Sequence, residues 1–90
     1  MKRFRLCFKG RVQGVGFRWT LCHIASKLNI TGFCENLDIG DVLVEVQGNN
    51  DNLDEFLKEV LEHKGYIRID DYSISSIELI DHETTFDVKY

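Results

Sequence analysis

Three glycines, Gly10, Gly14 and Gly16, lie close together near the start of the chain, between a strand-like run and a helix-like run. Apolar and polar residues alternate over residues 4–9, as in a half-buried strand, and apolar residues recur at helical spacing over residues 19–28. Glycine adopts positive φ readily, so this segment can turn tightly and aim several N–H groups into one concavity. The chain therefore has to fold around a tight strand-to-helix turn.

Arg18 stands where the helix is expected to begin. A helix start offers free N–H groups and the positive end of the helix dipole, and a guanidinium forms paired hydrogen bonds with phosphate oxygens. The segment is therefore typical of an anion-binding loop. A glycine-rich turn with incidental arginines is the alternative, and spacing alone leaves both open.

Two nucleotide motifs are excluded by the residues themselves. A P-loop ends in Gly-Lys-Ser/Thr, and here Phe17 and Arg18 take the place of Lys-Ser/Thr. A dinucleotide fingerprint beginning at Gly14 would need a third glycine where Trp19 stands. A smaller anion than a nucleotide is the better expectation.

Charge is divided unevenly along the chain. Residues 1–34 carry +7 and no acid, whereas residues 35–90 carry all fifteen acids and a charge of −11, for a net charge of −4. The glycine-rich loop lies in the basic part, which favours a small anionic ligand. The negative net charge of the whole chain argues against broad nucleic-acid binding, although local charged patches matter more than the total.

Ninety residues are enough for one domain, which we place at 1–90. No apolar run is long enough to span a bilayer, and Arg5 and Lys9 interrupt the start of the chain, so no secretory segment is expected. The odd number of cysteines without metal-site spacing fits reduced thiols in a cytoplasmic protein; they are Cys7, Cys22 and Cys34. At least Cys22 and Cys34 are expected to pack in the core.

The order of predicted elements gives the fold. Strands are expected at 4–9, 30–37, 42–47, 74–80 and 86–90, helices at 19–28 and 53–61, and a hairpin turn at 38–41. The sequence leaves open whether the fourth strand starts earlier, within 66–73. His63, Lys64 and Gly65 are expected to end the second helix. This βαββαβ order with a short C-terminal strand predicts an α+β, ferredoxin-like fold, with two helices on one face of an antiparallel or mixed sheet.

The predicted topology brings two distant segments together. With a right-handed crossover, the first two strands run parallel and end at the same edge of the sheet. The loop and Arg18 follow the first strand, and Asn36 ends the second. Alternation puts Asn36 on the face of Cys34, which the helices cover, so Asn36 can point toward the start of the first helix.

These residues resemble the two signatures of the acylphosphatase family. Residues 10–18 resemble the first signature, and residues 32–36 with Gly40-Asp41-Val42 and Gly48 resemble the second. The resemblance covers nearly the whole chain. It implies a ferredoxin-like fold and hydrolysis of the carboxyl-phosphate bond of small acyl phosphates, without metal or cofactor.

The resemblance also assigns roles to residues. Arg18 takes the position of the phosphate-binding arginine, and Asn36 that of the asparagine that positions the attacking water. The amides of the first signature correspond to Val12, Gln13, Gly14, Val15, Gly16, Phe17 and Arg18. Glu35 departs from the family pattern, and alternation sends it to the face opposite Asn36, so it should affect substrate affinity or steering more than chemistry.

The expected partners are a small acyl phosphate and inorganic phosphate or similar anions, with no nucleic acid and no membrane, and the chain is expected to be a monomer. Two other classes stay open. One is an RNA-binding ferredoxin-like module, which would need exposed aromatic residues on the central strands. The other is an acylphosphatase-like domain of a larger carbamoyl-transfer factor for hydrogenase maturation.

Overall fold

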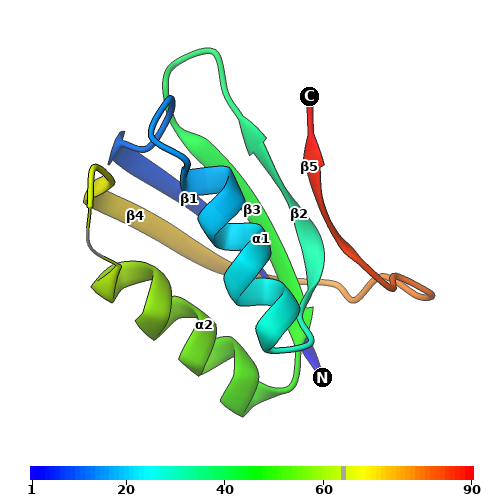
Figure 1. Cartoon of the computed structure of the whole chain (residues 1–90). Helices are drawn as coiled ribbons and strands as arrows, with labels where there is room; N and C mark the ends of the chain where they lie inside the picture. Colours follow the sequence, from blue (N-terminus) through cyan, green and yellow to red (C-terminus); the bar gives the residue numbers. More distant parts are fainter. Residues whose placement is uncertain (64) are drawn as a thin grey trace.

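A computed structural model describes residues 1–63 and 65–90 (Figure 1). Its elements, in chain order, are β1 (Lys2–Arg11), α1 (Phe17–Lys27), β2 (Thr31–Asn36), β3 (Val42–Gly48), α2 (Asn50–Glu62), β4 (Arg68–Ile77) and β5 (Phe86–Lys89). The predicted βαββαβ order with a short final strand is therefore confirmed. The predicted end of the second helix falls partly on Lys64, which lies outside the described residues.

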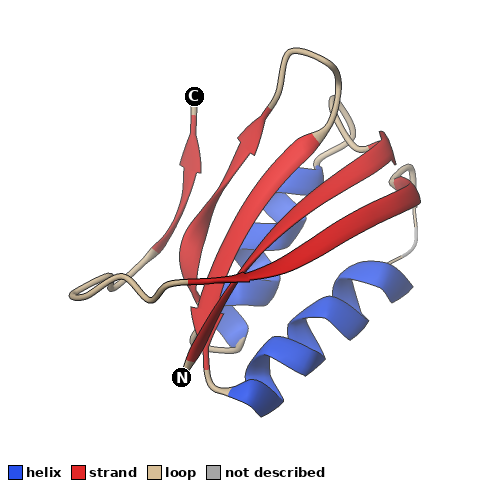
Figure 2. Ribbon diagram, turned by 180° about the vertical axis from the view of Figure 1, so that it is seen from behind, coloured by secondary structure: helices blue, strands red, loops and turns tan. Residues whose placement is uncertain are grey.

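The strands form a mixed sheet in the order β4-β1-β3-β2-β5. β1 pairs antiparallel with β3 and with β4, and β2 pairs antiparallel with β3 but parallel with β5. Since β1 and β2 both run opposite to β3, they run parallel to each other, as predicted. Both helices lie against one face of the sheet (Figure 2).

Two strands differ from the sequence prediction by more than one residue. β1 spans Lys2–Arg11 instead of 4–9, and β4 spans Arg68–Ile77, so it starts within the range left open and ends before residue 80. The pairing of β1 with β4 continues beyond a register shift between Lys9 and Gly10 and ends at the pair of Arg11 with Arg68. Both strands are longer than expected at this end because of that pairing. Local alternation does not reveal such pairing. The loop between β1 and α1 is consequently residues 12–16.

The helix ends follow ordinary capping chemistry. α1 is followed by Asn29 in the left-handed conformation, with φ of 54°, which asparagine tolerates better than most residues. α2 starts at Asn50 because the side chain of Asn49 accepts a hydrogen bond from the Asn52 amide at 2.8 Å.

The core fills the space between the helices and the sheet. The Phe8 ring of β1 meets the Phe17 ring at the start of α1 edge to face, with centroids 5.4 Å apart, and both side chains are fully buried. Such pairs contribute about 0.5–1.5 kcal/mol beyond area burial. The N-terminus of α1 is thereby fixed against β1, close to where β1 ends.

The face of the sheet away from the helices carries a buried polar network. Arg3 is only 1% exposed and pairs with Glu45 at 3.0 Å and Glu83 at 2.7 Å. Glu83 belongs to the segment between β4 and β5, which we call the strap (residues 78–85). The strap also bonds Gln47 through both backbone groups of Ile80. Glu83 is therefore partly buried against the sheet and paired with a cation. The strap holds down the segment that leads into β5.

Candidate active site

The loop of residues 12–16 ends in a helix start without a side-chain cap. Gly16 occupies the N-cap position in the left-handed conformation, with φ of 79°, and has no side chain that could accept from the first-turn amides. Gly14 has φ of 73°, and a methyl group on either glycine would contact nothing within 4 Å. The backbone conformation, not crowding, therefore calls for glycine.

Charge at this helix start is entirely positive. The first turn of α1 contains no acid, so nothing on the helix neutralises the positive end of its dipole. Arg18 lies in that same turn, where a cation is unfavourable for the helix. No carboxylate in residues 1–63 or 65–90 forms an ion pair with Arg18. This arrangement is suited to an external anion.

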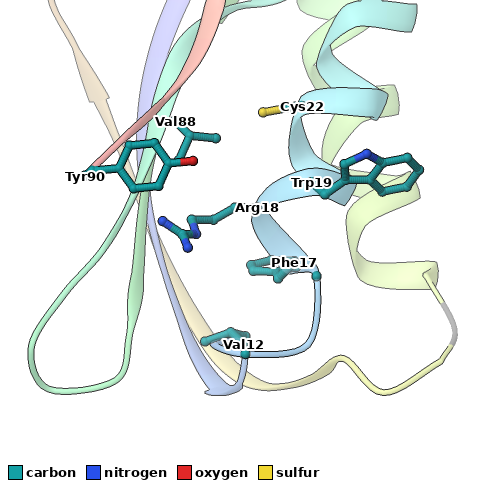
Figure 3. Close-up of a pocket in the computed structure, with 9 residues that line it drawn as sticks. Val12, Phe17, Arg18, Trp19, Cys22, Val88 and Tyr90 are labelled. Atoms are coloured by element: carbon teal, nitrogen blue, oxygen red, sulfur yellow. The ribbon is translucent and has the colours of Figure 1, made fainter.

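A cavity of about 350 Å³ opens beside the loop (Figure 3). It is lined by the loop and α1, through Val12, Gly14, Gly16, Phe17, Arg18, Trp19 and Cys22, and by Val88 and Tyr90 at the C-terminal strand. Five of the seven residues predicted to bind phosphate thus line one cavity. The two others, Gln13 and Val15, do not. Val15 packs against the core instead.

Arg18 reaches from α1 toward β5. Its guanidinium carbon lies 5.3 Å from the centre of the Tyr90 ring, which corresponds to a cation–π contact. Figure 3 shows the side chain pointing away from the axis of α1 and toward Tyr90. No sequence pattern places Tyr90 or Val88 beside the loop, because their position depends on β5 pairing with β2.

Asn36 ends β2 on the face that the helices cover, as predicted. It pairs with Val42, which pairs with Phe8, and both neighbours are fully buried in the core. Asn36 does not line the 350 Å³ cavity. Its Oδ1 is buried and has no hydrogen-bond partner within residues 1–63 and 65–90. A buried carbonyl oxygen without a partner costs about 1–3 kcal/mol, so this acceptor is left unsatisfied by the described residues.

Gln13 connects the loop to the turn that follows Asn36. Its Nε2 donates to the carbonyl oxygens of Leu37 at 2.8 Å and Asp41 at 2.9 Å. Sequence spacing pointed only to the backbone amide of Gln13 and gave no signal for this use of its side chain. The contact links the predicted phosphate loop directly to the turn after β2.

The thiol of Cys22, which lines the cavity, and that of its neighbour Cys34 are both less acidic than a free cysteine. Burial raises the pKa of the Cys34 thiol to about 12, with a further contribution from Cys22, and burial also raises the pKa of Cys22. Cys34 is fully buried in the core and Cys22 packs against it. This agrees with a packing role, because the thiolate is the nucleophilic form.

Metal-ligand clusters of three or more His, Cys, Asp or Glu side chains are not found among the described residues. Nor do these residues include a helix long and apolar enough to cross a membrane.

Glu35 lies on the opposite face of the sheet from Asn36. It pairs with Leu43 in β3 and Lys89 in β5, and Lys89 Nζ lies 3.8 Å from the centre of the Phe33 ring on that face. The Glu35 carboxylate therefore points away from the loop side of the sheet. Because Lys89 covers the Phe33 ring, the RNA-binding alternative gains no stacking surface from it.

Comparison with known proteins gives a consistent result. A model of the acylphosphatase family matches residues 4–88. An acylphosphatase from Clostridium beijerinckii is 39% identical over 90 residues, with 100% of both chains covered. The crystal structure of acylphosphatase from Bacillus subtilis superposes with a TM-score of 0.93 at 29% identity, again over 100% of both chains. Full-length HypF in a phosphate- and nucleotide-bound form matches with a TM-score of 0.90 at 27% identity, over 99% of this chain but 12% of HypF.

Proposed function

Since this chain belongs to the acylphosphatase family, we propose that it hydrolyses the carboxyl-phosphate bond of small acyl phosphates, with residues 12–18 binding the phosphoryl group. The observation that carries this proposal is the uncapped start of α1, where Arg18 lies in the first turn and a cavity opens beside it. The backbone amides of Val12, Gln13, Gly14, Val15, Gly16, Phe17 and Arg18 and the Arg18 guanidinium are the proposed donors to phosphoryl oxygens. Such preorganised donors stabilise charge that grows as the bond breaks.

Asn36 is the proposed anchor of the attacking water. Its unpartnered Oδ1 accepts one hydrogen bond from that water and leaves a lone pair of the water oxygen directed at phosphorus. The new P–O bond forms as the bond to the acyl oxygen breaks, the carboxylate departs with the electron pair, and the proton of the water passes to phosphate or solvent. A neutral carboxamide suits this role because it adds no negative charge beside the phosphate.

The reaction as proposed uses no metal and no cofactor. Arg18 and the loop amides supply positive charge that a metal ion supplies in other phosphoryl-transfer sites, and an acyl phosphate already has a good leaving group. Dialysis against EDTA should therefore leave the rate unchanged. A loss of rate that Mg²⁺ restores would reject this part of the proposal.

We further propose that residues 1–90 act as one domain, as a cytoplasmic monomer. The full-length match to the C. beijerinckii acylphosphatase supports a free-standing enzyme. The match to 12% of HypF supports the alternative, a domain within a longer protein. Cys7, Cys22 and Cys34 form no disulfide, which suits a reducing compartment. Size-exclusion chromatography with light scattering measures the mass of the native protein, which distinguishes a free-standing monomer from an oligomer or from a longer chain.

Steady-state hydrolysis of benzoyl phosphate by Asn36→Ala tests the assignment of the water. The variant should lose kcat by about 10²–10³ while KM changes much less, because the partner of Asn36 is the water and not the phosphate. The control is p-nitrophenyl phosphate, a monoester that the wild type should hydrolyse far more slowly. An increase in KM alone would make Asn36 a substrate ligand and leave the water without its proposed anchor.

A further inference from the structure

We propose that the Gln13 side chain is a positioning residue, which holds Asn36 at a fixed distance from the phosphate-binding loop. This inference rests on the proposed function, because it assigns to Gln13 an effect that acts through Asn36. It concerns the carboxamide of Gln13 and is separate from the backbone amide of the same residue.

Both N–H groups of the Gln13 carboxamide donate hydrogen bonds to the turn between β2 and β3. Nε2 donates to Leu37 O at 2.8 Å and to Asp41 O at 2.9 Å, on the two sides of the turn between β2 and β3. The turn is closed by its own bonds, Leu37 N to Asp41 O at 2.8 Å and Gly40 N to Leu37 O at 3.0 Å. Gln13 therefore adds a bridge from the loop to a turn that is already formed.

The bridge reaches the backbone right next to Asn36. Leu37 directly follows Asn36, and within the described chain no group bonds the Asn36 Oδ1 to hold it in place. The position of that oxygen relative to the loop thus depends on the Asn36 backbone, which lies at the end of the β2–β3 ladder next to the turn. In a site of this kind, a misplacement of about 1 Å can lower the rate by ~10²-fold.

A different outcome follows if Gln13 merely stabilises the fold. Loss of a neutral bridge between two surface segments would then lower the melting temperature, and any loss of rate would be independent of Asn36. Residues that act through one another are non-additive, whereas independent sites add within about 0.3–0.5 kcal/mol, a factor of about two in rate. A double-mutant cycle separates these two cases.

The cycle uses Gln13→Met, which keeps the length of the side chain and removes both donors. We expect kcat for benzoyl phosphate to fall by about 10–100-fold. The inhibition constant of inorganic phosphate should stay within about threefold, because Arg18 and the loop amides remain. In an Asn36→Ala background, the same substitution should lower kcat by less than about threefold.

Gln47 offers a matched control. It also ties a loop through two backbone bonds, Nε2 to Ile80 O at 3.0 Å and Ile80 N to Oε1 at 2.9 Å, but on the opposite face of the sheet. Gln47→Met should lower the melting temperature and leave kcat unchanged. If Gln13→Met fails to fold, Gln13→Asn serves instead, because its shorter side chain cannot reach both carbonyl oxygens.

The outcomes distinguish this inference from the function on which it rests. An equal loss of kcat in the wild-type and Asn36→Ala backgrounds would overturn the role of Gln13 alone, as would an unchanged kcat in Gln13→Met. A parallel rise in the phosphate inhibition constant would also overturn it, since Gln13 would then act on the loop. If Asn36→Ala kept full kcat, Asn36 would not position the attacking water, and the proposed role of Gln13 would be overturned as well.

Discussion

Replacing Arg18 by alanine should separate activity from stability. The guanidinium gains a contact with the Tyr90 ring at 5.3 Å, which is worth about 0.5–1 kcal/mol at an exposed site. It also places a cation in the first turn of α1, which costs about 0.3–1 kcal/mol against the helix dipole. Because these effects oppose each other, the net change in the free energy of unfolding should stay within about 1 kcal/mol, or ~4–8 °C in melting temperature.

The effect on catalysis should be much larger. Loss of a preorganised donor to the transition state typically costs ~10²–10³ in rate, or about 2.7–4 kcal/mol. Arg18→Lys restores the charge but not the two parallel hydrogen bonds of the guanidinium, so it should recover only a small part of the loss.

Initial rates with benzoyl phosphate and thermal unfolding by circular dichroism measure both quantities on the same samples. A loss of kcat/KM below tenfold in Arg18→Ala would refute the assignment of Arg18 to the phosphate. A fall in melting temperature well beyond ~8 °C would show instead that Arg18 stabilises the fold by more than its contact with the Tyr90 ring.

Other predictions concern residues outside the loop. Glu35→Gln should leave kcat nearly unchanged and lower KM modestly, and the effect on KM should shrink as salt is raised from 0.05 to about 0.5 M; a large loss of kcat would instead make Glu35 a candidate base. Arg3→Met leaves Glu83 half-buried without its cation and should lower the free energy of unfolding in urea by about 3–5 kcal/mol, with kcat retained in the folded fraction; a cost below about 1 kcal/mol would contradict a role in holding the strap. The pKa of Cys34 is raised from 9.0 to about 12 in the folded protein. Above pH 9 the unfolded chain releases this proton and the folded chain keeps it, so stability should fall as pH rises from about 9 toward 12. Cys34→Ala should have a shallower fall, and an unchanged slope would count against burial as the cause.

The fold could be predicted to a large extent because its signals are local. Alternation predicted the bounds of β2 and β3 to within one residue, and helical spacing predicted both helices to within three residues. β4 was placed poorly for a physical reason. It is an edge strand with mostly exposed residues, and the register shift opposite Lys9 and Gly10 breaks its alternation.

The candidate site was predictable only where its residues lie next to one another or follow a strand's alternation. The loop and Arg18 form one continuous segment, and alternation put Asn36 on the correct face. The Gln13 bridge and the pair of Arg3 with Glu83, which are 80 residues apart, depend on side chains meeting across the folded sheet. Periodicity carries no information about such contacts.

Binding of inorganic phosphate tests most directly whether the loop and the start of α1 hold the phosphoryl group. Phosphate is the product that shares the proposed contacts, so a titration of uniformly ¹⁵N-labelled protein reports which amides meet it. We expect the largest shifts at residues 12–18, with a dissociation constant equal to the inhibition constant of phosphate in the benzoyl phosphate assay. Unmoved amides in residues 12–18, with shifts gathered instead around Arg5 and Lys9 on the other face of the sheet, would contradict the proposed site.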